Sequence, residues 1–550
     1  APVVANAISD QAVDEDAAFS FTVPANTFTD VDGDALTYAA SLANGDPLPS
    51  WLTFNAATRT FSGTPLNGDV GVLNVRVTAN DGNGGTVSDA FALDVAPVAS
   101  PALITFGGAA LTAIDASDIV VNTSSAGSEI KLSVLALADG DYVVAWSGQG
   151  PGSQGLGDVY MQRFDSSGAR LDGNIKVNTT HSTYEWVPSM TRTADGYVVA
   201  WVTESGDGSG RGISGQRFDS DGTPLGGEFR INTTTAGAQQ SPTLASLPDG
   251  GFLAVWQSFG QDGSGEGVYA QRFTSAGVKS GGEFQLNATA GGDQYNPSVS
   301  VFSDGGFVAF WSSPDANGTG VVGRRFDAAG TPIGVDFAVN VSATGEQYYP
   351  AAAVLADGGF IVTWSSDGGQ DGSSYGVFSR RFAANGTAVT GDQLVNTFTT
   401  GQQRLQSVQA LPDGGYIISW TSLDQDGSSW GIFGQRYAAD GSPVGAETQL
   451  NANSAGVQFN DTGSGGYEVA LTSDGVFIQA FQGNGNVYIR RFETAQAFNG
   501  AEDGDLIALP MTVAATETGE TVTAVVLSGL PVGSVLSAGT SNANGTVWTF

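Results

Sequence analysis

The sequence has 550 residues, a length typical of about four domains at ~150 residues each. Hydrophobic residues reach 41% and Gly numbers 78, so the chain can build cores, and its composition favours short strands and tight turns over wholesale disorder. A formal charge of −35 excludes nucleic acid and anionic membranes as partners, and the chain has no Cys for disulfides or thiolate sites and only one His for zinc or acid–base chemistry.

Residues 1–97 show alternating strands separated by two acidic turns, FTDVDGDALTY at 28–38 and VTANDGNGG at 77–85. Together with DEDAAFSFTVPANTFTDVDGDALTY and LPSWLTFNAATRTFSGTP, these stretches resemble a dystroglycan-type cadherin-like domain. That family forms a β-sandwich that is repeated in large bacterial surface proteins. The resemblance therefore implies a cadherin-like β-sandwich over residues 1–97.

The first acidic turn has the composition of a calcium site. Asp30, Asp32 and Asp34 alternate along it, and Ca²⁺ prefers a shell of carboxylate and carbonyl oxygens. The resemblance to the cadherin-like family adds Asp81, on the second turn, and Glu15 as further ligand positions. We expect calcium to be the cofactor of this domain.

A connector at 98–117 precedes a region that repeats itself seven times. In each repeat an apolar strand follows an Asp-Gly turn and ends in an aromatic residue, as in DGGFLAVW at 249–256. The closing aromatics are Trp146, Trp201, Trp256, Trp311, Trp364, Trp420 and Phe481, spaced by 55, 55, 55, 53, 56 and 61 residues. We expect these aromatics to form the cores of the repeats.

Each repeat contains four strands, which we name A (SPTLASL at 241–247), B (the strand with the aromatic), C (GVYAQRF at 267–273) and D (EFQLN at 283–287). Seven such units predict a seven-bladed, four-stranded β-propeller over residues 118–495. The strand DIVVN at 118–122 precedes the first strand A, whereas no strand D follows the last strand C. We therefore expect this N-terminal strand to complete the last blade and close the ring, which removes exposed sheet edges.

Two further features of the repeat have structural interpretations. Strand C carries an Arg in every repeat, and we expect it to bond loop carbonyls or acidic turns: Arg163, Arg217, Arg272, Arg325, Arg381, Arg436 and Arg491.

The loops between strands B and C carry Asp207, Asp262, Asp371 and Asp426 at equivalent places. These Asp residues are interpreted either as calcium ligands or, as we favour, as Asx-turns that bond their own backbone. The loops also faintly resemble the structural Asp-box of sialidases.

The rim formed by the D-to-A and B-to-C connections varies between repeats, whereas the A-to-B turns are uniform Asp-Gly hairpins. Variable loops on a rigid scaffold are typical places for binding. We therefore predict that this variable rim binds a ligand, and that sugar faces or peptide side chains suit its aromatic and amide groups. The candidate residues are Tyr184, Trp186, Gln239, Tyr295, Tyr348, Tyr349, Tyr375, Arg404, Trp430 and Phe459, with Gln294 and Gln347 beside them.

Residues 496–550, with AEDGDLIAL and NANGTVWTF, resemble the start of a further extender β-sandwich of RTX-type adhesins. The resemblance implies a secreted, calcium-stabilised, monomeric piece of a longer bacterial surface adhesin, with tandem extender domains in the same chain. Its ligand would be a glycan, peptide or protein on another cell or surface. No apolar run is long enough for membrane insertion.

The repeat leaves little room for an active site, so we expect the chain not to be an enzyme. A glycan-cleaving propeller with paired carboxylates is the alternative, and Glu185 and Glu204, which break the repeat, are then the first candidates. A non-binding spacer is a third possibility, although a wide propeller is poorly suited to that role.

Overall fold

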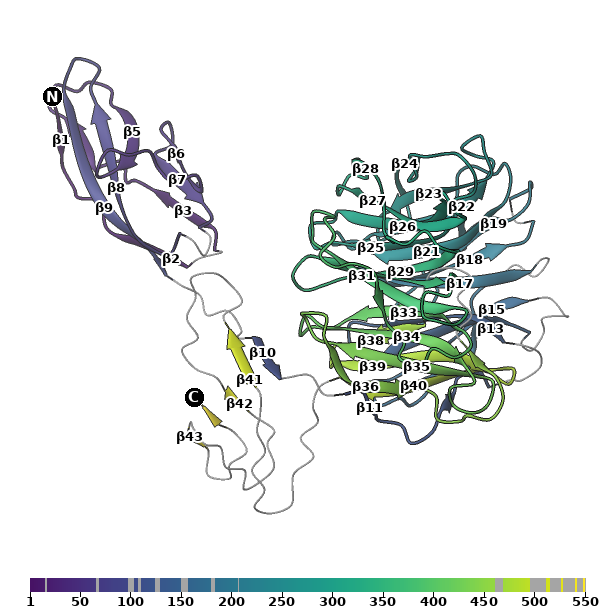
Figure 1. Cartoon of the computed structure of the whole chain (residues 1–550). Coiled ribbons are helices and arrows are strands. Elements are labelled where there is room, and N and C mark those ends of the chain that lie inside the picture. Colours follow the sequence, from purple (N-terminus) through teal and green to yellow (C-terminus); the bar gives the residue numbers. More distant parts are fainter. Residues whose placement is uncertain are drawn as a thin grey trace. The chain divides into compact units, whose positions relative to one another are not determined.

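The computed structural model describes residues 1–14, 17–65, 69–96, 103–106, 110–123, 129–149, 157–179, 184–205, 207–459 and 468–494, with short strands at 511–514, 526–527, 540–541 and 548–549. The chain divides into two compact units, Ala1–Gly107 with Phe498–Phe550 and Gly108–Ala497 (Figure 1). Within the described residues the regular structure is β-sheet, and no helix there is long and apolar enough to cross a membrane. The predicted all-β fold class is confirmed.

The N-terminal sandwich consists of two main sheets. One has the order β2 (Gln11–Asp14), β9 (Thr86–Ala96), β8 (Gly71–Asn80) and β5 (Thr37–Leu42), and the other β3 (Phe19–Thr22), β7 (Thr60–Gly63) and β6 (Leu52–Asn55). A short pair joins β1 (Pro2–Val4) to β4 (Phe28–Asp30). Alternate residues Val75, Val77 and Ala79 of β8 are fully buried, and they pack with Phe61 and Phe91 because successive side chains of a strand point to opposite faces.

The predicted connector 98–117 is divided between the two units. Strand β10 (Leu103–Phe106) pairs with β41 (Met511–Ala514) in the first unit, whereas β11 (Thr112–Ala113) pairs with the propeller strand β40. The last short strands, β42 (Val526–Leu527), β43 (Thr540–Ser541) and β44 (Trp548–Thr549), form one sheet. The remainder of the predicted domain at 496–550 lies outside the described residues.

The second unit contains seven sheets that form the blades (Figure 1). In the order A, B, C and D, blades 1 to 3 are β13 (Ile130–Ala136), β14 (Tyr142–Gly148), β15 (Asp158–Phe164) and β16 (Ile175–Lys176); β17 (Glu185–Thr193), β18 (Gly196–Thr203), β19 (Gly212–Phe218) and β20 (Phe229–Arg230); β21 (Gln239–Ser246), β22 (Phe252–Phe259), β23 (Glu266–Phe273) and β24 (Lys279–Gln285). Blades 4 to 6 are β25 (Tyr295–Val301), β26 (Phe307–Pro314), β27 (Thr319–Phe326) and β28 (Pro332–Ala338); β29 (Gln347–Val354), β30 (Phe360–Ser366), β31 (Gly376–Phe382) and β32 (Gln393–Leu394); β33 (Gln403–Ala410), β34 (Tyr416–Leu423), β35 (Trp430–Tyr437) and β36 (Pro443–Gln449). Blade 7 contains β37 (Gln458–Phe459), β38 (Val469–Leu471), β39 (Val476–Gly483) and β40 (Asn486–Glu493).

Strand B reads as a continuous apolar run because neighbouring blades cover both of its faces. Every residue of β14 is buried, and the closing Trp residues of the repeats are among the largest fully buried side chains. Burial of one large apolar side chain stabilises a fold by about 1.5–3 kcal/mol. The expectation that the repeated aromatics form the blade cores is confirmed.

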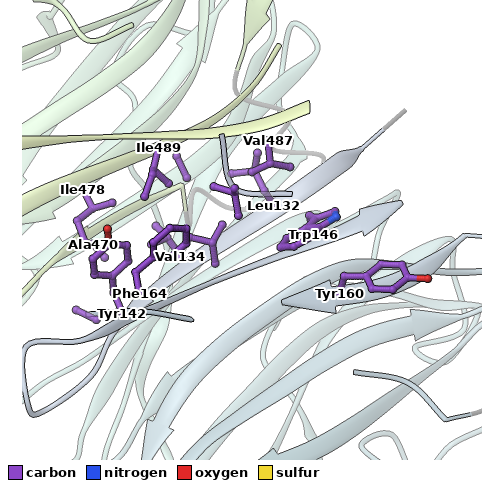
Figure 2. Packing of buried hydrophobic residues seen from close by; sticks show 14 residues of the cluster. Leu132, Val134, Tyr142, Trp146, Tyr160, Phe164, Ala470, Ile478, Val487 and Ile489 are labelled. Atoms are coloured by element: carbon purple, nitrogen blue, oxygen red, sulfur yellow. The ribbon is translucent and has the colours of Figure 1, made fainter. Parts of the chain in front are cut away.

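The ring closes as predicted, with an N-terminal strand completing blade 7. Strand β12 (Ile119–Val120) pairs antiparallel with β40. Figure 2 shows the apolar contact between the last and first blades, in which Ile478, Val487 and Ile489 pack with Leu132 and Val134. Closure is therefore made by both backbone pairing and core packing.

The repeated Arg of strand C joins neighbouring elements in the way that the sequence predicts. Arg217 forms an ion pair with Asp195 of the A-to-B turn at 3.0 Å and donates to the carbonyl of Ala276 in the next blade at 3.3 Å. Arg381 makes the same pair of contacts, with Asp357 and Ala439. Both proposed partners of the Arg residues, acidic turns and loop carbonyls, are thus present.

Acidic residues of the outer strands hold neighbouring blades together. In blades 2 to 7 a carboxylate in or just before the outer strand accepts backbone N–H groups from the loop that leaves the preceding blade. The bonds join Glu228 to Thr179, Glu283 to Thr233 and Thr234, Asp336 to Ala288 and Thr289, Asp392 to Val341 and Ser342, Glu447 to Thr397, and Asp118 to Ala452 and Asn453. Asp118 belongs to the N-terminal strand, which therefore replaces strand D of blade 7 in its side chain as well as in its pairing.

Candidate functional site

Strand A of each of the first six blades begins with a bulge at the variable rim. A register shift interrupts its pairing with strand B, for example between Trp186 and Ser189. The residue at the bulge has a left-handed backbone, with φ from 50° to 56° at Lys131, Val187, Ser241, Asn296, Tyr349 and Leu405. For the β-branched Val187 this conformation is an outlier that surrounding structure must maintain. The repeat thus builds a strained ring at the channel mouth.

Two register positions next to this ring carry residues that differ from blade to blade. The first position precedes the bulge residue and contains Trp186, Gln240, Tyr295, Tyr348 and Arg404. The second precedes the Gly that opens strand C and contains Arg211, Glu266, Thr319, Tyr375 and Trp430. All of these side chains are half-buried. Six of them were candidates from the sequence because of their aromatic or cationic character, whereas Gln240, Arg211, Glu266 and Thr319 were missed.

In blades 2 and 3 the two positions join into one polar chain. The Arg211 guanidinium lies over the Trp186 ring at 4.8 Å and its Nε pairs with Glu204 Oε2 at 3.0 Å. Its NH1 donates to Gln240 Oε1 at 2.7 Å, and Gln240 Nε2 donates to Glu266 Oε1 at 3.3 Å. Glu204, a sequence candidate for catalysis, therefore belongs to this rim.

Glu266 stands in an environment that favours its protonated form. Its Oε2 is buried and has no hydrogen-bond partner among the described residues. Burial and the nearby Asp293 carboxylate raise the pKa of Glu266 to about 6, against hydrogen bonds from Gln257 and Gln240 that lower it. A carboxylic acid with this pKa can hold and release a proton near neutral pH.

In blades 4 to 6 the same positions form an aromatic cluster. Tyr295 and Thr319 share a hydroxyl hydrogen bond at 3.4 Å. The Arg404 guanidinium lies 5.9 Å from the Tyr375 ring and 4.7 Å from the Trp430 ring. Burial raises the pKa of Tyr375, so its hydroxyl stays protonated and able to donate. Tyr348 lies against Tyr349, with ring centroids 6.0 Å apart.

The remaining sequence candidates for ligand binding are placed differently. Tyr184 is 49% exposed at the start of blade 2. Gln239 is fully buried and bonds to Asn232 and the carbonyl of Ala236, so it positions a loop and does not face a ligand. Gln294 and Gln347 make the same bonds in their own blades. For Phe459 only the backbone, in β37, belongs to the described part of the chain.

The position of Gln239 is occupied by Glu in blades 1 and 2. Glu185 is 1% exposed and accepts the indole N–H of Trp201 at 3.1 Å, so this second catalytic candidate lies inside the blade core and not on the rim. Glu129, which the sequence argument missed, is 3% exposed and bonds to Trp146, and burial raises its pKa to about 7. The sequence signal for both is a Glu where other repeats have Gln.

The acidic loops of the propeller form the Asx-turns that the sequence favoured. Asp207 Oδ1 accepts the amide of Ser209 at 3.1 Å, and Asp262, Asp371 and Asp426 bond in the same way at 2.9–3.0 Å. Each Asp also packs against the Gly that opens strand C. The turn geometry accounts for Oδ1 of each Asp, whereas the buried Oδ2 of Asp371 and of Asp426 has no hydrogen-bond partner among the described residues.

Carboxylates in the N-terminal sandwich converge as the sequence predicts. Oxygens of Asp30, Asp32 and Asp34 lie within 4.8 Å of one another. The second acidic turn lies against the first, because Asn83 Nδ2 donates to Asp34 Oδ2 at 3.0 Å.

The buried oxygen of this cluster also fits a cation. Asp30 Oδ2 has no hydrogen-bond partner among the described residues, although its Oδ1 accepts the amides of Asp32 and Asp34. An all-oxygen donor set of this kind suits Ca²⁺. The fifth predicted ligand, Glu15, lies outside the described residues.

The comparisons with known proteins concern the fold. Residues 1–96 match the family model He_PIG, described as "Putative Ig domain". No curated protein sequence matches the chain significantly. Among solved structures, a protein of unknown function from Dyadobacter fermentans is similar at 12% identity and a TM-score of 0.40, over 70% of this chain and 99% of that one.

Other similar structures are glycoside hydrolases. The GH93 α-L-arabinofuranosidase of Fusarium graminearum has 12% identity and a TM-score of 0.42, over 69% of this chain and 97% of that one. The α-L-arabinanase of Penicillium chrysogenum has 14% identity and a TM-score of 0.40, over 70% and 98%. The expectation that the chain is not an enzyme is corrected by this finding, because the repetition of a fold among blades does not exclude an active site. At this identity no residue, substrate or mechanism carries over.

Proposed function

We propose that the propeller binds a glycan at its variable rim and hydrolyses a glycosidic bond there. The observation that carries the proposal is Glu266, a half-buried carboxylic acid with a raised pKa and an unpartnered oxygen, in one polar chain with a second carboxylate, Glu204. Two carboxyl groups in contrasting environments are what glycoside hydrolysis requires.

The two carboxylates have distinct roles in this proposal. Glu266 donates its proton to the glycosidic oxygen as the carbon–oxygen bond breaks, and the leaving sugar carries that proton away. Glu204, held by Arg211 at 3.0 Å, accepts a proton from the water that adds to the anomeric carbon. Arg211 and Gln240 bridge the two carboxylates through hydrogen bonds, so the two groups act at separate points of the substrate.

The aromatic cluster of blades 4 to 6 supports sugar binding beside this pair. Tyr375, Trp430 and Tyr348 offer amphipathic rings of the kind that stack on sugar faces, and Arg404 adds a donor for hydroxyl groups. The rim therefore has one acidic side and one aromatic side. A substrate longer than one sugar unit would contact both.

The test is product release from a panel of plant and bacterial polysaccharides and aryl glycosides, followed by reducing-end assay and mass spectrometry. We expect the wild-type chain to release sugar, and Glu266→Gln to bind the same polysaccharide with at least a hundredfold lower rate. Asp440→Asn, an exposed turn residue remote from the rim by sequence and register, serves as the matched control. Binding without turnover in the wild type would refute hydrolysis and leave a binding rim of the adhesin kind.

A second proposal concerns calcium in the N-terminal sandwich. We propose that Asp30, Asp32, Asp34 and Asp81 bind Ca²⁺ and stiffen this domain, since oxygens of the first three converge and the buried Oδ2 of Asp30 has no hydrogen-bond partner among the described residues. Such a site suits the calcium-rich exterior of a cell. We therefore also propose that the protein is secreted to a bacterial surface, where it is a monomeric part of a longer adhesin-like chain.

A further inference from the structure

A cavity of about 520 Å³ opens at the other end of the propeller channel, among the ends of the inner strands where the uniform A-to-B turns begin. Strands A of blades 1, 2, 3, 4, 6 and 7 line it. The sequence argument treated this rim as purely structural because its turns repeat. The cavity lies among the strand residues before those turns, and these residues do not all repeat.

Most of the lining side chains are apolar, but hydroxyl, amide and backbone groups make about half of the exposed lining polar, and one side chain is charged. Half-buried Leu135, Ala245, Val301 and Leu471 contribute apolar side chains from four blades. The chain has 55 acidic residues, yet none of them lines this cavity, whereas Arg192 does. The local charge is therefore opposite to that of the whole molecule.

Arg192 breaks the repeat at a defined register position. It pairs with Tyr197, the first aromatic of strand B in blade 2. The residues that pair with the corresponding aromatic in the other blades are Ala136, Ser246, Val301, Val354, Ala410 and Leu471. A small or apolar residue is thus sufficient for the fold at this position, and the cation has no counterpart in the ring.

Arg192 is also the one Arg without a partner among the residues that the structure describes. Every other Arg has a hydrogen bond, an ion pair or an aromatic contact, including those of strand C and of the variable rim. Arg192 is exposed and forms none of these contacts. Since a guanidinium forms strong, often bidentate, bonds with carboxylates, an unpaired one at the edge of this cavity can bind an anionic ligand.

We propose that this cavity binds a small organic carboxylate with an apolar body. The carboxylate meets Arg192 at the cavity edge, and the hydrocarbon part lies among the half-buried side chains of Leu135, Ala245 and Val301. The volume is within the range of about 300–1,000 Å³ that ligand pockets have. The site lies at the opposite end of the channel from the variable rim, so it does not depend on the proposed glycan function.

The experiment is isothermal titration of the whole chain with octanoate and, separately, with octanol. We expect one octanoate to bind per chain, and Arg192→Ala to weaken this binding at least tenfold while the weaker binding of octanol is unchanged. Ser246→Trp, which fills the cavity from the next blade, should abolish both. Arg230→Ala, at an exposed outer-strand position, is the matched control for removing a positive charge.

Two outcomes would overturn the proposal. One is equal octanoate affinity in Arg192→Ala and the wild type, and the other is equal affinity of the wild type for octanol and octanoate. Circular dichroism and the melting temperature of each variant verify that the propeller is folded, so a loss of binding reports on the cavity. Unchanged polysaccharide binding in Arg192→Ala would show that the two ends of the channel act separately.

Discussion

The side-chain oxygen of Asn122 accepts the backbone N–H of Val487 at 2.9 Å, although the two residues are 365 positions apart in the chain. The same bond exists within other blades between residues only 19 positions apart, for example from Val268 to Asn287 at 2.9 Å. In the closing blade the N-terminal strand supplies the Asn. This bond therefore joins the two ends of the propeller with the same geometry that it has inside the other blades.

We expect Asn122→Ala to destabilise the propeller by about 1–3 kcal/mol, because the buried amide of Val487 loses its acceptor. Chemical denaturation of the whole chain, followed by Trp fluorescence, measures this loss. The local variant Asn287→Ala removes the same bond inside one blade and is the comparison. If closure by the distant strand matters less than internal pairing, Asn122→Ala will leave the midpoint unchanged while Asn287→Ala lowers it.

Glu129→Gln should stabilise the chain at alkaline pH. Burial raises the pKa of Glu129 to about 7, above its usual value of 4.5, so the folded state retains a proton that the unfolded state loses. The stability present below the unfolded pKa is thus lost as pH rises from about 4.5 to about 7, and the loss then stays constant. Gln occupies the equivalent place in blades 3 to 7, so the variant fits the fold.

The measurement is the melting temperature of Glu129→Gln and wild type across this pH range. We expect the two melting temperatures to differ little at the acidic end of this pH range. Above pH 7 the variant should melt several degrees higher than the wild type. Asp440→Asn, at an exposed turn, is the control for removal of one negative charge. A difference that is constant with pH would contradict a buried, titrating Glu129.

Hydrolysis by the rim should have a pH profile set by Glu266. Because this group acts as an acid, the rate should fall as pH rises through about 6, the pKa to which burial and Asp293 raise it. Asp293→Asn removes the neighbouring negative charge, so the pKa of Glu266 should decrease and the alkaline limb should move to lower pH. Initial rates across the pH range test this, and an unmoved limb in Asp293→Asn would assign the titration to another group.

Calcium should raise the melting temperature of the N-terminal sandwich. Binding to the folded state alone stabilises by about 2.7 kcal/mol at a concentration a hundred times the dissociation constant. We expect the transition of this domain to shift upward with millimolar Ca²⁺, to return with chelator, and to be insensitive in Asp30→Asn. Calorimetry resolves it from the propeller transition, and an equal shift in Asp30→Asn would place the ion elsewhere.

Much of the fold could be predicted because the blade is a local pattern. The Asp-Gly turn, the apolar strand and its closing Trp recur within about 55 residues, and alternation and turn chemistry act over such distances. The excess strand at 118–122 and the missing last strand D together predicted closure. Likewise, the alternating carboxylates of Asp30, Asp32 and Asp34 needed only one turn to converge.

What the sequence alone could not determine is which side chains meet across blades. Arg211 and Glu266 were missed because each precedes a Gly at the start of strand C, and only the ring geometry brings Arg211 of blade 2 to Gln240 and Glu266 of blade 3. Gln239, by contrast, was included on chemistry although its neighbours bury it.

The sequence did not indicate Arg192 as a candidate residue for the same reason. A single cation in a strand indicates no site until five other inner strands place their residues around the same cavity. The sequence by itself determined the blade, its core and its closure, because these depend on patterns within one repeat or on counting strands. Only the tertiary structure decided which residues meet at the two ends of the channel. A site made by equivalent positions of different blades depends on contacts between residues that are far apart in the chain.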